Sequence, residues 1–177
     1  MDYGYGMAVL SVDRQLCFAL YSASRAMTAA YRPVLTEMNL TYPQYLVLLV
    51  LWEAATDTTS EGRVTVGQLG ERLQLDSGTL SPLLKRLEAN GFVRRERSRD
   101  DERLVEVTLT ESGRSLESRA QCIPERLFAS TGMTEQDAAD LRDAVRRLTD
   151  ALTASPDAPH ARSATPHQKS QHEGTPQ

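Results

Sequence analysis

Few side chains in this 177-residue sequence are able to carry out redox or nucleophilic chemistry. Two are cysteines, Cys17 and Cys122, and the three histidines, His160, His167 and His172, all lie close to the C-terminus. Because residues 1–159 contain no histidine, Ser–His–Asp and Cys–His catalysis and most zinc sites are excluded there. We therefore expect a cysteine to be the reactive side chain, with no metal and no cofactor.

Cys17 lies near the start of a predicted helix. Ser11 or Asp13 is suited to cap a helix that runs from there toward Pro33. Cys17 would then lie within about one turn of the helix N-terminus, where the dipole favours the thiolate. Tyr21 follows on the same face and is able to donate a hydrogen bond to the sulfur. The alternative is that Cys17 is a small inert hydrophobic residue, as most lone cysteines in helices are.

The cellular setting is predicted from what the sequence lacks. Two cysteines cannot form a disulfide framework, so a reduced cytoplasmic compartment is expected. The longest apolar run, Tyr45–Trp52, is far shorter than the roughly 20 residues that cross a bilayer, so no membrane contact is expected. The N-terminus has no basic stretch followed by an apolar segment, so no signal peptide is expected.

Charge is unevenly distributed along the chain. The net charge is −4, yet residues 63–99 carry eight basic and four acidic side chains, while the flanking residues 1–62 and 100–153 are both acidic. DNA is bound by local phosphate contacts, so the basic middle matters more than the acidic total. Charge by itself is equally compatible with an ordinary solvated surface.

Hydrophobic periodicity and capping residues predict a mainly helical chain. Helices are expected at about 11–32, after Thr41 through Tyr45–Trp52, from Thr65 to Leu73, after the turn Leu75–Ser77 to Gly91, from Thr110 with an interruption at Pro124, and from Thr134 to about 153. Two strands, Phe92–Arg97 and Leu104–Leu109, are expected to flank a charged turn. Residues 154–177 are rich in proline and poor in large apolar side chains, so we predict a disordered tail.

Two short helices, a tight turn and a two-stranded hairpin follow one another in the basic segment. This order is that of a winged helix-turn-helix, so the expected fold is mainly α with a small β-hairpin wing. Residues of about 64–110 would bind DNA, the second helix in the major groove and the wing in the minor groove. The apolar stripes outside this segment predict a homodimer with a helical dimerisation region. The predicted DNA contacts are Ser77, Gly78, Thr79, Ser81, Lys85, Arg86, Arg97, Arg99, Asp101 and Arg103.

Residues 10–153 resemble the MarR family of dimeric transcriptional regulators. The resemblance is carried by the string LDSGTLSPLLKRLEANGFVRRERSRDDERLVEVTLTESG. It implies a dimer interface built from the helices of about 11–32 and 111–153. It also implies that Asp101 orients Arg103 by a salt bridge, and that two recognition helices read a pseudo-palindromic operator in double-stranded DNA.

A second pair of strings, LCFALYSASRAMTAAYRPVL and LTYPQYLVLLVLWE, resembles the organic-hydroperoxide-sensing OhrR branch of this family. The resemblance implies that Cys17 is the peroxide-reactive cysteine. It implies that Tyr31 and Tyr42 contact this cysteine from the partner subunit, with Tyr21 nearby. The implied function is a repressor that releases its operator when Cys17 is oxidised to a sulfenic acid by an organic hydroperoxide and then captured by a thiol.

Cys122 departs from the OhrR pattern. One OhrR subgroup has a resolving cysteine after an Ile-Pro-Glu segment, which is present here as Ile123–Glu125. Ala129 and Met133 occupy the sites where that cysteine is expected, and Cys122 lies upstream. We therefore expect Cys122 to be structural, and a small cellular thiol to capture oxidised Cys17.

Two other functions fit parts of the sequence. A MarR-type repressor controlled by a small aromatic ligand would share the DNA-binding fold and would remain inducible after Cys17→Ser. A thiol peroxidase would use Cys17 catalytically, but it needs a thioredoxin-like βαβ framework or a resolving partner, and neither is visible in the sequence.

Overall fold

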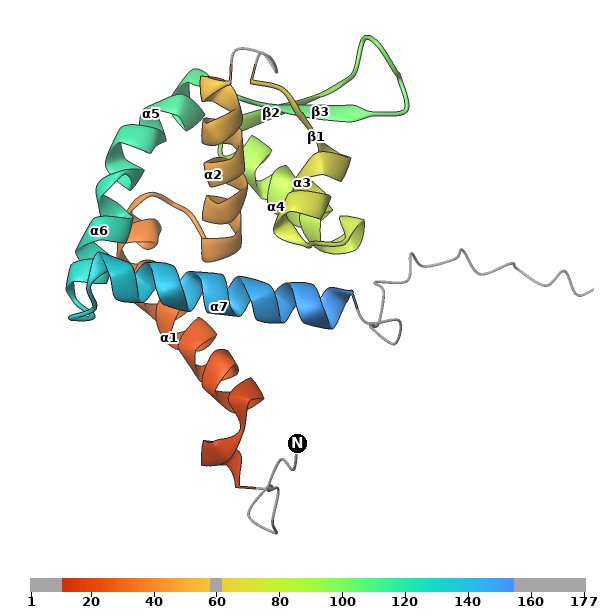
Figure 1. Cartoon of the computed structure of the whole chain (residues 1–177). Helices are drawn as coiled ribbons and strands as arrows, with labels where there is room; N and C mark the ends of the chain where they lie inside the picture. Colours follow the sequence, from red (N-terminus) through yellow and green to blue (C-terminus); the bar gives the residue numbers. More distant parts are fainter. Residues whose placement is uncertain (1–10, 58–61, 155–177) are drawn as a thin grey trace, which may run out of the picture. The chain divides into compact units, whose positions relative to one another are not determined.

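The computed structural model describes residues 11–57 and 62–154, which divide into two compact units with the boundary in the sequence between Gly132 and Met133 (Figure 1). The first unit contains a 3-10 turn η2 (Val12–Arg14), α1 (Leu16–Glu37), α2 (Tyr42–Thr56), β1 (Val64–Thr65), α3 (Val66–Leu73), α4 (Ser77–Ala89), β2 (Val93–Arg97), β3 (Val105–Leu109), α5 (Glu111–Ala120) and α6 (Cys122–Ala129). The second unit contains α7 (Glu135–Thr153). The predicted tail and its three histidines lie outside the described residues, except for Ala154.

Helix α1 differs from its predicted bounds at both ends. It begins at Leu16, after an extended Gln15, and neither Ser11 nor Gln15 caps a helix with its side chain. It continues through Pro33 to Glu37, although proline removes one hydrogen bond of the helical ladder. Burial of Leu35 and Met38 offsets this loss, because the end of α1 packs against the hydrophobic core.

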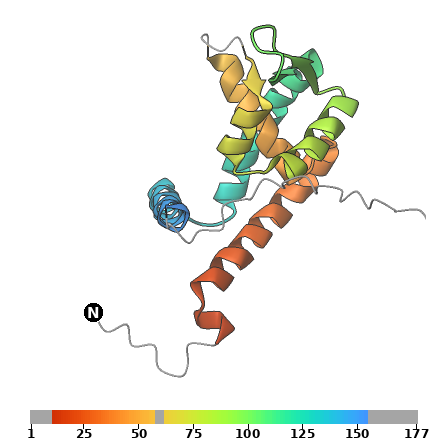
Figure 2. The ribbon, with the colours of Figure 1, turned by 90° about the vertical axis from the view of Figure 1, so that its right-hand side faces the viewer.

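The first four turns of α1 carry apolar side chains that the rest of the unit leaves uncovered. Leu16 is 61 % exposed, and Phe18 and Met27 are also exposed. Figure 2 shows this end of α1 extending away from the bundle formed by α2 to α6. The predicted apolar stripe is thus present, and in the described chain much of it stays exposed.

Helix α2 contributes the largest share of the buried core. Thr41 and Gln44 form a reciprocal capping box, and Pro43 lies in the first turn, where its missing amide is not needed. Seven of its fifteen residues are buried, and within the apolar run Tyr45–Trp52 only Leu49 is exposed, at 39 %.

Helices α3 and α4 form the predicted helix-turn-helix. Thr65 caps α3 by accepting a hydrogen bond from the Gln68 amide. Asp76 caps α4, and Gly91 ends it in the left-handed conformation that the sequence predicts, with φ of 75°. Three leucines hold α4 to the core: Leu80, Leu84 and Leu87.

The sheet has three strands, one more than predicted. The hairpin of β2 and β3 is confirmed, with Val93 opposite Leu109 and Arg97 opposite Val105. The additional strand β1 comprises only Val64 and Thr65 and pairs with β3, so the order is β1-β3-β2. Two residues are too few for an alternating pattern, and the pairing with β3 spans about 40 residues of chain, which explains why the sequence did not predict it.

The C-terminal helices begin at the predicted caps and are interrupted near the predicted proline. Thr110 caps α5, and the interruption falls at Gln121, between α5 and α6, because Pro124 cannot donate to the Ala120 carbonyl. Thr134 caps α7. Within the part of the chain that the structure describes, no helix is long and apolar enough to cross a membrane.

Candidate functional site

The exposed face of α4 carries all of the predicted recognition-helix residues. Ser77, Gly78, Thr79, Ser81, Lys85 and Arg86 are exposed, while the leucines of the opposite face are buried. This amphipathic arrangement holds the polar face outward. A helix presented in this way has the width to enter a major groove.

The first turn of α4 is ordered by Asp76, which the sequence analysis did not single out. Its carboxylate accepts hydrogen bonds from the Thr79 amide at 2.9 Å and from the Thr79 hydroxyl at 2.8 Å. The hydrogen bond from the Thr79 side chain, followed by that from its backbone, lowers the pKa of Asp76 below its usual value. An aspartate directly before Ser-Gly-Thr is the signal that could have identified this cap.

The wing presents further basic side chains at its tip. Arg97, Arg99 and Arg103 are exposed, as predicted. The expected salt bridge between Asp101 and Arg103 is not formed in this structure: the Asp101 carboxylate accepts the backbone amide of Arg103 at 3.0 Å instead. A short acidic side chain in a tight turn readily bonds an amide two residues on, so Asp101 shapes the turn directly.

Cys17 is the second residue of α1, and its side chain is exposed. It therefore lies at the positive end of the helix, as the sequence analysis expected, although the cap differs. Tyr21 does not bond to it in the described chain; the Tyr21 hydroxyl accepts from Arg25 Nη1 at 3.0 Å. The Arg25 guanidinium also lies 5.6 Å from the centre of the Tyr21 ring.

Tyr31 and Tyr42 come together with a third tyrosine that the sequence analysis missed, Tyr45. The ring centres of Tyr31 lie 5.1 Å from Tyr42 and 5.6 Å from Tyr45. Burial raises the pKa of Tyr31 and of Tyr42, and for Tyr31 the nearby Tyr42 adds to the effect. All three hydroxyls are therefore protonated at neutral pH and are able to act as hydrogen-bond donors.

Cys17 is too far along α1 to meet this cluster within one chain. A helix rises 1.5 Å per residue, so the 14 positions from Cys17 to Tyr31 correspond to about 21 Å. A contact between Cys17 and the tyrosines would require a second copy of the chain.

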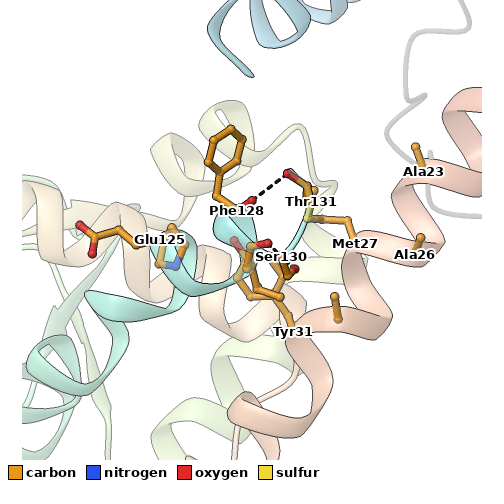
Figure 3. A pocket seen from close by; sticks show the side chains of 11 residues that line it. Ala23, Ala26, Met27, Tyr31, Glu125, Phe128, Ser130 and Thr131 are labelled. Carbon is orange, nitrogen blue, oxygen red and sulfur yellow. Dashed lines mark hydrogen bonds between the residues drawn. The ribbon is translucent and has the colours of Figure 1, made fainter. Parts of the chain in front are cut away.

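An apolar groove of about 540 Å³ lies between α1 and α6 (Figure 3). Tyr31 belongs both to its lining and to the tyrosine cluster. Glu125 is its only charged side chain, and Thr131 closes the end of α6 by donating to the Phe128 carbonyl at 2.7 Å. Its other lining residues are Ala23, Ala26, Met27, Ala30, Pro124, Leu127, Phe128 and Ser130.

Cys122 is the first residue of α6 and is exposed as an unpaired thiol. Its sulfur lies 3.7 Å from the Arg119 carbonyl oxygen, to which the thiol is able to donate. The described residues contain no group of three or more side chains placed to hold a metal ion.

Comparison with known proteins identifies the group to which this architecture belongs. Residues 29–119 match the family described as transcriptional regulator SarA/Rot. HTH-type transcriptional regulator TtmR of Methylorubrum extorquens (strain PA1) is 51 % identical over 144 residues, which cover 81 % of this chain and 70 % of TtmR. The chain belongs to this MarR-like family of winged-helix transcriptional regulators.

Two further relatives agree with this assignment. The organic hydroperoxide resistance transcriptional regulator of Bacillus subtilis (strain 168) is 44 % identical over 143 residues, covering 81 % of this regulator and 92 % of that protein. The crystal structure of AbfR of Staphylococcus epidermidis is 34 % identical, with a TM-score of 0.66 over 81 % of this chain and 95 % of AbfR. AbfR has also been solved in reduced form bound to DNA and in a disulfide form.

The relatives confirm the predicted fold class and the resemblance to MarR regulators. They are transcriptional regulators and not enzymes, so this chain is a regulator and the thiol peroxidase alternative is set aside. The individual contact residues remain predictions.

Proposed function

We propose that this regulator is a homodimeric DNA-binding repressor that senses organic hydroperoxides by oxidation of Cys17 and then releases its operator. The observation that carries the proposal is the exposed Cys17 at the N-terminus of α1, in a chain that is 44 % identical to an organic hydroperoxide resistance regulator. Such a protein is expected in the cytoplasm, where its thiols stay reduced.

DNA binding would use α4 and the wing. Small polar residues in the first turn of α4 allow close approach to base edges, and Lys85 and Arg86 would bind phosphates or a guanine edge. Arg103 at the wing tip would enter the adjacent minor groove, and Arg97 and Arg99 would contact the backbone. Two copies would present two α4 helices to a pseudo-palindromic site.

Dimerisation would cover apolar surface that the described chain leaves exposed. The first turns of α1 are uncovered, as described above, and α7 exposes 54 % of Leu141 and 62 % of Leu152. Exposed stripes of this kind are typical of protein interfaces. A dimer would also bring Cys17 of one chain to the tyrosine cluster of the other.

The sensing reaction would begin with attack of the Cys17 thiolate on the distal oxygen of a hydroperoxide. The O–O bond breaks, Cys17 is oxidised to the sulfenic acid, and the alkoxide leaves and takes a proton to become an alcohol. A small cellular thiol would then displace water and form a mixed disulfide. The apolar residues around the start of α1 favour an alkyl hydroperoxide over hydrogen peroxide.

The tyrosines would couple this reaction to DNA release. The partner's Tyr31 and Tyr42 would donate hydrogen bonds from their protonated hydroxyls to the reduced sulfur. Oxidation of Cys17 would remove these contacts and bias the dimer toward a state whose α4 spacing no longer fits the operator.

A DNA-shift assay on the region upstream of the regulator's own gene tests the proposal. Reduced protein is expected to bind, cumene hydroperoxide to release it, and Cys17→Ser to bind and resist release. Cys122→Ser is the matched control and is expected to be released like the wild type. Release of Cys17→Ser by the peroxide would contradict cysteine sensing, and an intersubunit Cys17–Cys122 disulfide on a non-reducing gel would contradict capture by a small thiol.

The groove between α1 and α6 favours one second candidate, control by a small aromatic ligand. Its volume and apolar lining suit a single aromatic ring with an alkyl or polar substituent. This function predicts that the Cys17→Ser variant is released from DNA by an aromatic compound in the absence of peroxide.

A further inference from the structure

Glu88 and Arg95 connect the end of α4 to the first strand of the wing. The Arg95 side chain donates to Glu88 Oε2 from Nε at 3.0 Å and from Nη2 at 2.6 Å. The Arg95 backbone amide donates to the other carboxylate oxygen, Oε1, at 3.1 Å. One carboxylate therefore accepts three hydrogen bonds from a single residue of the neighbouring element.

The backbone contact is possible because β2 lies at the edge of the sheet. In the order β1-β3-β2, the outer side of β2 has no neighbouring strand among the described elements. Glu88 binds an amide on this side, and the hydrogen bonds from Arg95 lower the pKa of Glu88, so the carboxylate stays ionised at neutral pH. The side chains of Arg95 and Glu88 are 30 % and 37 % exposed, so the pair is partly shielded from solvent.

The chain between the two residues is also tightly constrained. The Phe92 amide donates to the Leu87 carbonyl at 3.0 Å and the Gly91 amide donates to the Glu88 carbonyl at 2.9 Å, which closes the end of α4. The junction from Leu87 to Arg95 is thus held by backbone bonds on one side and by the carboxylate on the other. These bonds leave the wing little freedom to rotate about the end of α4.

We propose that Glu88 and Arg95 are positioning residues for DNA recognition, which set the angle between α4 and the wing so that both enter their grooves together. The proposal rests on the proposed DNA-binding function. Arg95 then acts within the protein, unlike Arg97, Arg99 and Arg103, which are predicted to contact DNA.

The proposal predicts an effect opposite in sign to that of simple electrostatics. Removing the negative charge of Glu88 makes the basic surface more positive, which by itself would strengthen binding to any duplex. Loss of the positioning contact would instead weaken binding to the specific site, because only that site requires both elements in register. The ratio of specific to non-specific affinity separates the two effects.

The matched control is Glu96, on the same strand. Its carboxylate lies 3.5 Å from Arg94, in a pair whose side chains are 65 % and 70 % exposed, and among the described residues this pair lies within β2 alone. Glu96→Gln therefore removes the same charge near the same surface while leaving the α4–wing contact intact.

The experiment measures affinity by fluorescence anisotropy for two duplexes of about 30 base pairs, a length that spans two half-sites. One carries the site that the wild type protects upstream of its own gene, and the other has the same bases in scrambled order. Glu88→Gln and Arg95→Lys are expected to lower the specific affinity about tenfold and to leave non-specific affinity equal or slightly higher. In the double variant the losses should not add, because both changes break one contact.

Several results would overturn the inference. One is that Glu88→Gln and Glu96→Gln raise both affinities alike, in which case Glu88 acts only as a charge. Another is an Arg95→Lys variant that binds like the wild type, since lysine keeps the charge but cannot form the same paired contacts. A wild type that does not distinguish the two duplexes would instead contradict the proposed function itself. Circular dichroism at the assay temperature shows that each variant is folded.

Discussion

The indole Nε1 of Trp52 donates a buried hydrogen bond of 2.9 Å to the backbone carbonyl of Gly113. This bond joins the end of α2 to the first turn of α5. On its other side, Gly113 packs so closely against the wing hairpin that an added Cβ would lie 2.0 Å from the Phe92 carbonyl oxygen. Gly113 thus contacts both α2 and the chain that leads into β2, and the close approach to Phe92 leaves no room for a side chain.

Gly113→Ala is therefore expected to destabilise the regulator by about 2–4 kcal/mol, because the backbone of Phe92 or of α5 must move to admit the methyl group. Urea unfolding followed by circular dichroism measures the loss. The control is Gly67→Ala in α3, where the added Cβ meets only the Thr65 hydroxyl at 3.9 Å. Alanine is expected to be neutral or stabilising there, and equal effects at the two sites would contradict the close approach.

The cap of α4 predicts a dependence of stability on pH. The folded pKa of Asp76 is lowered, so the unfolded chain binds a proton more readily than the folded chain. The contribution of Asp76 is present above the ordinary aspartate pKa, near 3.8, and is lost as the pH falls through the lowered value. Asp76→Asn keeps an acceptor for the cap but does not titrate.

Unfolding measured between about pH 5 and pH 2.5, the range around the ordinary aspartate value, should accordingly show a shallower loss of stability for Asp76→Asn than for the wild type. The same slope in both proteins would show that the cap does not depend on the charge of Asp76.

Tyr31→Phe and Tyr42→Phe each remove a hydroxyl proposed to donate to the reduced Cys17 of the partner chain. A hydrogen bond to a charged group contributes roughly 1.5 kcal/mol, so each change should slow Cys17 oxidation about tenfold. Mass spectrometry of the peroxide-treated protein measures the rate. Operator binding of the reduced variants should also weaken, because the contacts proposed to favour the operator-binding state are lost. Tyr45→Phe is the control: Tyr45 is 2 % exposed and its burial raises its pKa to about 12, so its loss should leave the rate unaffected.

The distance along α1 predicts that sensing operates between chains. Neither Cys17→Ser nor the double variant Tyr31→Phe/Tyr42→Phe is expected to respond normally as a homodimer. A mixed dimer of the two contains one complete site, in which Cys17 of one chain meets both tyrosines of the other. If the mixed dimer is released from DNA by cumene hydroperoxide at the rate expected of one wild-type site, this arrangement is supported. Release no faster than that of either variant homodimer would exclude it.

The exposed stripe of α7 predicts a role in dimerisation. Leu141→Glu places a charge on this stripe, which is costly to bury in an apolar interface. Light scattering should show a shift from dimer to monomer at micromolar concentration. Arg142→Glu, next to it and outside the stripe, should leave the dimer intact; a dimer that tolerates Leu141→Glu equally well would place the interface elsewhere.

Local features of the chain could be predicted from the sequence with good accuracy. The caps at Thr41, Thr65 and Thr110 depend on side chains within a few residues of the amides they bind. The same holds for Gly91, whose left-handed conformation ends α4. The basic segment, the recognition helix and the paired strands followed from periodicity and charge for the same reason.

Several features of the site were not predictable, because they depend on residues far apart in the chain. Helix α1 continues past Pro33 because Leu35 and Met38 find a core, which no local rule includes. One difference is local: the Asp101 carboxylate accepts from the Arg103 amide, two residues on, because the backbone of the turn brings the amide to it.

The sequence by itself determined the family architecture, the position of Cys17 near the start of a helix and the polar face of α4, because each is set by neighbouring residues. Only the tertiary structure decided that Tyr45 joins Tyr31 and Tyr42, and that Glu88 holds Arg95. It also decided that Gly113 must be glycine. The physical reason is the same in each case: these contacts form between separate elements, and their geometry exists only after the core that α2 organises has packed.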